Sequence, residues 1–202
     1  MVLFYAIYLV VRNGVISYQK ASGLAMFSGI VIFCFYSFIR LKEMLPVEEY
    51  GYDAIFFILL ILCFAWGGDT CAYFAGRAFG KHKLCPVVSP KKTVEGAIGG
   101  VLGTMVFGVL VTVIYSIAAD RMEEFTRSNI GVSMYVIIAL LACVAAVLGI
   151  YGDLFASVVK RQCGIKDYGT IFPGHGGILD RFDSVMFIAP FVTMVVIAAF
   201  YN

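Results

Sequence analysis

Charged side chains of both signs gather between residues 152 and 183. The acids are Asp153, Asp167, Asp180 and Asp183, and the bases are Lys160, Arg161, Lys166 and Arg181. Carboxylate oxygens are the ligands that Mg2+ prefers, and Lys and Arg side chains bind phosphate oxygens. This mixture predicts a site for a metal-bound polyanion.

The first part of this segment has the spacing of one helix face. Asp153, Ser157, Lys160 and Arg161 stand at positions i, i+4, i+7 and i+8. Such positions share one side of an α-helix. We therefore expect a polar stripe that faces a cavity.

The same offsets recur in Asp69, Tyr73, Gly76 and Arg77, at the end of a long apolar run. An acid within a membrane-spanning run is costly and is by default a functional-site hypothesis. We favour a substrate-binding role for Asp69. A structural pairing with Arg77 is the alternative.

A second basic group precedes another apolar run. It consists of Lys81, Lys83, Lys91 and Lys92. A solvated loop that sets the membrane topology, or a patch for anionic lipid, is one interpretation. The order Ser89-Pro90-Lys91-Lys92-Thr93 favours a binding role, because Ser89 or Thr93 can cap the following helix and direct its amides at an anion.

His175 stands between Gly174 and Gly176, directly after Pro173. It is either a turn residue or a substrate contact. We favour the contact, because a backbone lined by glycine can approach phosphate closely.

The composition indicates what kind of elements must position these residues. Hydrophobic residues make up 61% of the 202 residues and charged residues 14%, whereas soluble domains carry roughly 25% charged residues. The apolar content excludes a disordered chain. A net charge of only +2 argues against a nucleic-acid binder.

Uncharged runs have the length of membrane-spanning helices. Four of them cover residues 21–39, 97–119, 128–152 and 184–202, and a fifth covers 54–76 with Asp69 as its single charge. Each is near the roughly 20 residues that cross a bilayer. The run 1–11 is a half-span. We expect an all-α, polytopic membrane protein of five to six helices, forming one domain over residues 1–202.

Basic residues are distributed unequally between the two sides that these runs imply. One side has eleven, namely Arg12, Lys20, Arg77, Lys81, Lys83, Lys91, Lys92, Lys160, Arg161, Lys166 and Arg181. The other has four, namely Arg40, Lys42, Arg121 and Arg127. The positive-inside rule places the first side, with both polar segments, in the cytoplasm.

Several familiar motifs are missing from the sequence. Gly76 and Gly80 are too close for a P-loop, and no His-Glu-x-x-His pair occurs. The six cysteines form no Cys-x-x-Cys pair, and we interpret them as free thiols. Glycines 96, 99, 100 and 103 predict close helix packing.

The residues resemble a known family, the phosphatidate cytidylyltransferases or CDP-diacylglycerol synthases. The family pattern is met over 27 residues at Ser157, Lys160, Arg161, Lys166, Asp167, Gly169, Phe172, Pro173, His175, Gly176, Gly177, Asp180, Arg181 and Asp183. A second similar block contains Asp69, Tyr73, Gly76, Gly80, Lys81, Ser89, Pro90, Lys91, Lys92, Thr93, Glu95 and Gly96. The resemblance covers the catalytic region, residues 69–183.

The resemblance implies a reaction of phospholipid biosynthesis, in which CTP and phosphatidate give CDP-diacylglycerol and pyrophosphate. It implies an active site on the cytoplasmic face of the plasma membrane and a Mg2+ cofactor, with a second cation, Mg2+ or K+, also compatible. It also allows a homodimer. Members of the family generally have further N-terminal spans, so truncation and a compact variant are both open.

The resemblance also implies roles for individual residues. Asp153 and Asp180 are the first choice as metal ligands, with Asp167 and Asp183 supporting them. Phosphate contacts are expected from Lys160, Arg161, Lys166 and Arg181, and Lys91 and Lys92 would assist the leaving pyrophosphate. Positioning or substrate binding is expected of Asp69, Ser89, Thr93, Glu95, Ser157, His175, Gly176 and Gly177.

Two other functions match parts of the sequence. A CTP-dependent polyprenol kinase would transfer the γ-phosphate to a lipid alcohol from a similar architecture, but the unbroken pattern disfavours it. A transporter would use Asp69 and the polar loops as an ion path. Its charges should follow the midplane, whereas these gather at one interface.

Overall fold

The computed structural model describes residues 7, 11, 18–121, 131–169 and 177–200. Within these ranges the elements follow one another as α2 (Tyr18–Met44), α3 (Val47–Tyr50), α4 (Asp53–Phe79), β1 (Lys83–Cys85), β2 (Ser89–Thr93), α5 (Val94–Arg121), α6 (Val132–Gln162), the 3-10 turn η1 (Leu179–Arg181) and α7 (Val185–Phe200).

The helices confirm the expected all-α, polytopic architecture. Four helices, α2, α4, α5 and α6, are long and apolar enough to cross a membrane. The last predicted run forms α7, which has 16 described residues and is shorter than the roughly 20 needed for a perpendicular span. The half-span 1–11 falls outside the described residues except at positions 7 and 11.

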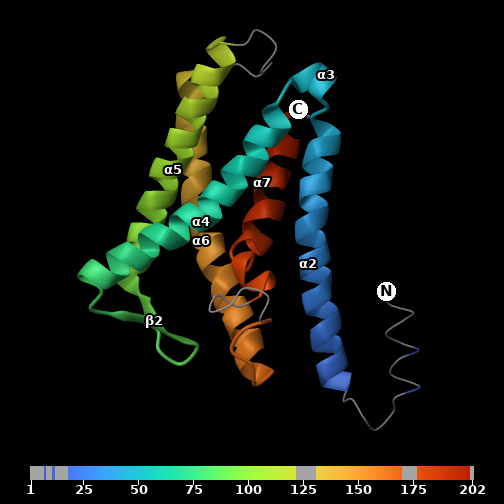
Figure 1. Cartoon of the computed structure of the whole chain (residues 1–202), viewed down its shortest axis with the longest axis vertical. Helices are drawn as coiled ribbons and strands as arrows, with labels where there is room; N and C mark the ends of the chain where they lie inside the picture. The colour runs from blue at the N-terminus through green and yellow to red at the C-terminus, as the bar shows by residue number, and fades with distance from the viewer. Residues whose placement is uncertain (1–6, 8–10, 12–17, 122–130, 170–176, 201–202) are drawn as a thin grey trace.

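Helix α4 crosses the molecule obliquely and packs along α5 (Figure 1). Glycines on α5 make this contact close, as predicted. A Cβ at Gly99 would collide with Ala75, one at Gly103 with Cys71, and one at Gly96 would lie 2.8 Å from the carbonyl oxygen of Ala72. Small residues therefore bring the two backbones together.

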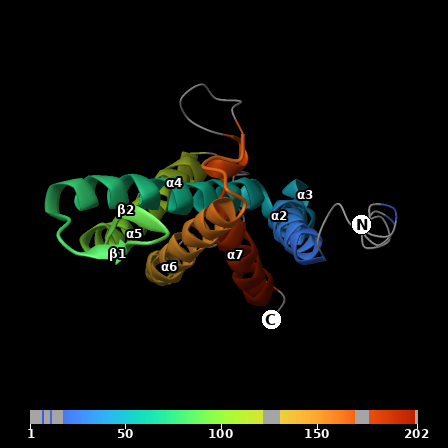
Figure 2. The same ribbon diagram turned by 90° about the horizontal axis from the view of Figure 1, so that it is seen from below.

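The remaining core forms where α2, α4, α6 and α7 meet. Leu60, Ile61 and Phe64 of α4 are at most 1% exposed there, and α7 packs on both α2 and α6. Seen from below, α2 and the strands β1 and β2 lie on opposite sides of α6 and α7 (Figure 2). Helix α6 thus separates two regions of the molecule.

The segment between α4 and α5, expected as a loop, is an antiparallel hairpin of two short strands. Lys83 pairs with Thr93 and Cys85 with Ser89. An alternating pattern was absent here, so no strand was predicted. The backbone amides of Lys81 and His82 fix the start of the hairpin by donating to the Glu95 carboxylate.

The second polar segment also departs from a simple loop, because α6 continues to Gln162. Asp153 to Arg161 therefore lie in one helix, as the spacing predicts, and of the four residues Asp153 lines the cavity described below. The hairpin and the C-terminal end of α6 lie at one end of the bundle, and α3 and the end of α7 lie at the other (Figure 1). Both polar segments therefore share one end.

Candidate active site

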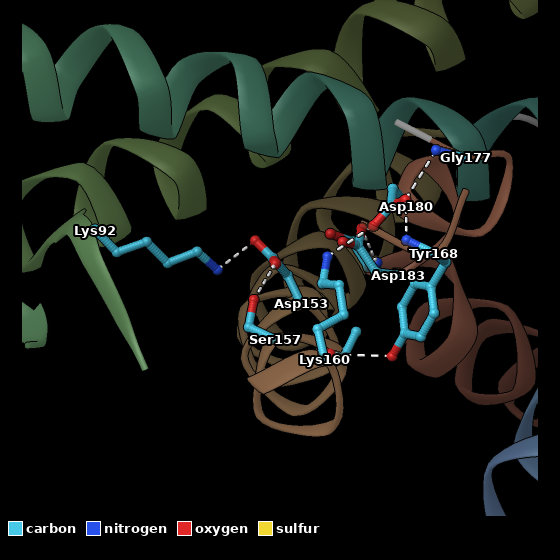
Figure 3. A network of polar contacts seen from close by, with 10 residues as sticks. Lys92, Asp153, Ser157, Lys160, Tyr168, Gly177, Asp180 and Asp183 are labelled. Atoms are coloured by element: carbon cyan, nitrogen blue, oxygen red, sulfur yellow. Dashed lines mark hydrogen bonds and ion pairs between the residues drawn. The ribbon is translucent and has the colours of Figure 1, made fainter. Parts of the chain in front are cut away.

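A cavity of about 410 Å3 lies between the ends of α4, α5 and α6 and strand β2. Its lining includes four predicted acids from three regions of the chain, with predicted cationic and capping residues beside them: Asp69, Lys91, Lys92, Thr93, Asp153, Asp180 and Asp183. The structure thus brings the two polar blocks into one site. Part of this network is drawn in Figure 3.

Asp153 forms the link between α6 and the hairpin. Its Oδ2 lies 2.5 Å from Nζ of Lys92, and its Oδ1 accepts a hydrogen bond of 3.4 Å from Ser157 one turn later. Both partners of the ion pair are partly buried, with side-chain exposures of 25% for Lys92 and 23% for Asp153. Asp153 therefore lines the cavity with a cation already beside it.

Asp180 forms a more fully buried ion pair. Its Oδ1 lies 2.8 Å from Nζ of Lys160, one step along the α6 face from Ser157. Its Oδ2 accepts the backbone amides of Tyr168 at 2.8 Å and Gly177 at 2.9 Å. Burial acts against the charged form, but these hydrogen bonds outweigh it and lower the pKa of Asp180. Asp180 is thus held as a carboxylate.

Asp183 and Asp69 extend the negative charge toward α4. Ser184 connects them, since its hydroxyl donates to Asp69 at 2.9 Å and its amide donates to Asp183 at 2.9 Å. Burial, together with repulsion from Asp153 and Asp69, raises the pKa of Asp183 to about 7. The proximity of the other carboxylates therefore makes Asp183 harder to ionise than an isolated aspartate.

The alternative pairing of Asp69 with Arg77 is not observed. Arg77 donates instead to the hydroxyl of Tyr73 at 3.3 Å, and among the described residues no ion pair joins Arg77 to Asp69. Tyr73 and Arg77 both line the cavity. The predicted polar face of α4 therefore forms one wall of the site.

The start of α5 supplies a second wall. The amide of Gly96 donates to Oγ1 of Thr93 at 3.1 Å, so Thr93 is the cap and Ser89, which lies in β2, is not. Gly96 and Thr93 line the cavity beside Lys91 and Lys92. A helix N-terminus next to two lysines favours a bound anion.

Glu95 has a different position from the one expected for a substrate contact. Its carboxylate lies 2.6 Å from Nδ1 of His82 and accepts two backbone amides of the hairpin. It does not line the cavity. In this structure Glu95 holds the hairpin against α5.

Other predicted residues lie around the cavity or outside the described ranges. The side chains of Arg161, Lys166, Asp167 and Arg181 are exposed and do not contribute to its lining. His175 and Gly176 fall within 170–176 and outside the described residues. Gly177 is buried and contacts Asp180 through its amide.

Three positioning residues were not predicted from the sequence. Tyr168 donates its amide to Asp180 and its hydroxyl to the carbonyl of Ala156 at 3.0 Å. Trp66 of α4, interpreted as an interface or packing residue, donates its indole N–H to the carbonyl of Arg181 at 3.0 Å. Ser184 directly follows Asp183, and this adjacency is the feature of the sequence that could have indicated its role.

The donor set suits a hard cation. The candidate ligands are all carboxylates, and Mg2+ typically binds through one or two carboxylates with waters and substrate phosphates completing its shell. Among the described residues no three His, Cys, Asp or Glu side chains form a preformed metal cluster. The carboxylates alone therefore supply only part of the ligands that such an ion needs.

Comparison with known proteins shows the family of the chain. The model of the Cytidylyltransferase family matches residues 1–199. The chain is 32% identical over 191 residues to a phosphatidate cytidylyltransferase of Bacillus subtilis, covering 95% of this chain and 64% of that protein. Identities to proteins of the same name from Staphylococcus haemolyticus and Staphylococcus epidermidis are 39% and 42% over 145 residues, which cover 72% of this chain and 50% of theirs.

The chain therefore spans between half and about two thirds of the length of these relatives. The family match extends across both polar blocks and all the described helices. The matched region thus contains the carboxylates, the lysines and the capped helix start. On these grounds the chain belongs to the cytidylyltransferase family.

Proposed function

We propose that the protein transfers a cytidylyl group from CTP to phosphatidate, forming CDP-diacylglycerol and pyrophosphate in phospholipid biosynthesis. The observation that carries this proposal is one cavity, at one end of a membrane bundle, that joins four aspartates with Lys91, Lys92 and the N-terminus of α5. Such a site can hold a nucleoside triphosphate and lies within reach of a lipid phosphate.

The chemistry needs charge neutralisation and alignment more than a general base. The phosphate of phosphatidate is already anionic, and it must approach the α-phosphorus of another polyanion. Cations and amides arranged around the reacting phosphates stabilise the charge of the transition state. Holding both substrates in fixed positions reduces the entropic cost of bringing them together. This explains why lysines and carboxylates, and not a catalytic triad, fill the cavity.

Mg2+ bound here would neutralise and orient the phosphate oxygens. We assign Asp153 and Asp180 as the residues that would hold it, with Asp183 and Asp69 as further oxygen donors on the same cavity. A second cation, Mg2+ or K+, is compatible with this number of carboxylates. Lys92 is placed to bind phosphate once it leaves Asp153, and Lys91 lies beside it.

We further propose that the cavity faces the cytoplasm from the plasma membrane. The end of the bundle with the cavity carries most of the basic residues of the chain, which is the bias of cytoplasmic loops. CTP is a cytoplasmic nucleotide, so this orientation gives the site access to it.

The test is to incubate the purified protein with CTP labelled in its cytosine ring and with phosphatidate, and then to extract the lipid. We expect labelled CDP-lipid and free pyrophosphate, loss of both with EDTA, and their return with Mg2+. A lipid-alcohol kinase would instead release labelled CDP and form no labelled lipid. That result, or activity unaffected by EDTA, would contradict the proposal.

A further inference from the structure

A second, larger cavity lies on the other side of α6 from the carboxylates. It has a volume of about 930 Å3 and lies between the first half of α2 and the last turn of α6. Its walls are mainly apolar and include Leu24, Phe27, Val31, Val159 and Leu179. The volume falls within the roughly 300–1,000 Å3 typical of small-molecule sites. We name this space the α2–α6 groove.

The α2–α6 groove is separated from the charged cavity by one layer of residues. Tyr168 belongs to both sides, because its ring stacks on Phe27 at 5.2 Å while its amide donates to Asp180. Leu179 and Val159, which line the groove, directly precede Asp180 and Lys160. The apolar space thus begins one residue away from the buried ion pair.

The position of the groove along α2 fixes its depth in the bilayer. Its α2 residues lie near the start of the apolar helix stretch Ala21–Met44, at the end of the bundle that carries the hairpin (Figure 1). The groove is therefore in the leaflet nearest to the charged cavity. A lipid of that leaflet can place its headgroup and its chains at these two depths at once.

Two basic residues stand next to groove residues in the sequence. Arg161 and Lys166 are exposed, and each is adjacent in sequence to a groove residue, Gln162 and Ile165 respectively. Exposed basic residues in the same short segment as apolar groove residues complement an anionic headgroup attached to a hydrocarbon chain.

We propose that the α2–α6 groove binds an acyl chain of the phosphatidate substrate and holds its phosphate toward the Lys160–Asp180 pair. This inference rests on the proposed function, because it identifies where that substrate is held. It predicts that long acyl chains contribute to the specificity constant through contacts that a short-chain substrate cannot make.

Two glycines of α2 give a matched pair of variants. A Cβ at Gly23 or at Gly29 would have nothing within 4 Å, so both positions have open space for an added side chain. Gly23 lines the groove and Gly29 does not. Gly23→Phe therefore fills the groove, while Gly29→Phe is a control of the same size on the same helix.

The kinetic test compares kcat/KM for dioleoyl and dihexanoyl phosphatidate. We expect Gly23→Phe to lower the ratio of the two constants by about tenfold, the lower range of discrimination in apolar pockets. Gly29→Phe should keep the ratio of the unchanged protein. An equal effect of both variants, or an unchanged ratio in Gly23→Phe, would overturn the proposal.

A binding test that needs no turnover uses Cys163, which is exposed and lines the groove. We expect dioleoyl phosphatidate to slow alkylation of Cys163 by N-ethylmaleimide several-fold, and dihexanoyl phosphatidate to leave the rate unchanged, as followed by mass spectrometry. Equal protection by both lipids, or by neither, would overturn the assignment of the groove.

The two readouts also separate this inference from the proposed function. Absence of CDP-lipid with the unchanged protein would contradict the function, whereas Cys163 protection is measured without product. If Gly23→Phe dissociates an oligomer in size-exclusion chromatography and leaves the kinetic ratio unchanged, a second copy of the chain occupies the groove and the proposal is wrong.

Discussion

Lys92 on strand β2 and Asp153 on helix α6 form an ion pair across the charged cavity, with 2.5 Å between Nζ and Oδ2. The lysine balances the charge of Asp153, the carboxylate that we assign as a ligand of Mg2+. Metal and lysine therefore compete for Asp153, and a lysine displaced by metal becomes available to phosphate.

Replacing Lys92 by glutamine should separate these two roles. We expect Lys92→Gln to tighten Mn2+ binding by about fivefold, which corresponds to about 1 kcal/mol for a partly buried pair, while CDP-lipid formation falls. Thermal shift in a Mn2+ titration measures the affinity. Lys91→Gln removes the same charge from an exposed neighbour, and an equal change in both variants would show that only the overall charge matters.

Asp153→Asn and Asp180→Asn should each reduce CDP-lipid formation by at least about a hundredfold, because a group that stabilises transition-state charge is lost. The structure predicts a difference between them in stability. Asp180 balances buried Lys160 and accepts two amides, so Asp180→Asn should also lower the melting temperature. Asp120→Asn, at the exposed far end of α5, is the control, and near-normal turnover in Asp153→Asn would refute the metal assignment.

The raised pKa of Asp183 gives a pH dependence with a defined sign. The pKa of Asp183 in the folded protein is about 7, which lies above the ordinary value of an aspartate. At pH values between these two pKa values, the folded protein therefore binds more protons than the unfolded chain. In EDTA, this group should make the protein more stable as the pH falls from about 8 to about 6.

Asp183→Asn should flatten that dependence and raise the melting temperature at pH near 8, since it removes a carboxylate that burial and neighbouring charges disfavour. Differential scanning fluorimetry in detergent, with and without EDTA, follows both effects. A steeper pH dependence in the variant would contradict the assigned cause.

The proposed orientation predicts which residues a membrane-impermeant maleimide reaches in intact cells. A cysteine in place of Glu48, exposed on α3, should be labelled, and one in place of Lys92 should be labelled only after the cells are opened. Labelling of the unchanged protein gives the background from its native cysteines. The reverse pattern would overturn the cytoplasmic placement of the cavity.

Helix positions could be predicted because uncharged length and 3.6-residue spacing are local properties. The helical conformation from Asp153 to Arg161 and the packing role of Gly99 and Gly103 follow from such spacing, and both agree with the structure. The hairpin could not be found in this way, since three- and five-residue strands with Pro90 inside one of them carry no alternation.

The partners of the site residues depend on contacts between distant segments. Lys92 and Lys160 both appeared as phosphate ligands, yet in this structure they neutralise Asp153 and Asp180. Glu95 matched the family pattern but contacts the hairpin. Residue type indicated the chemistry, while the choice of partner was set by how α4, α6 and β2 meet in space.

Two hydrogen bonds attach α4 to the turn before α7, from Trp66 to the Arg181 carbonyl and from Ser184 to Asp69. A helix that crosses the bundle obliquely changes its tilt when the bilayer becomes thicker or thinner. With these two attachments, the turn carrying Asp183 follows that movement. The distance between Asp69 and Asp183 should therefore change less with the thickness of the bilayer than the tilt of α4 does.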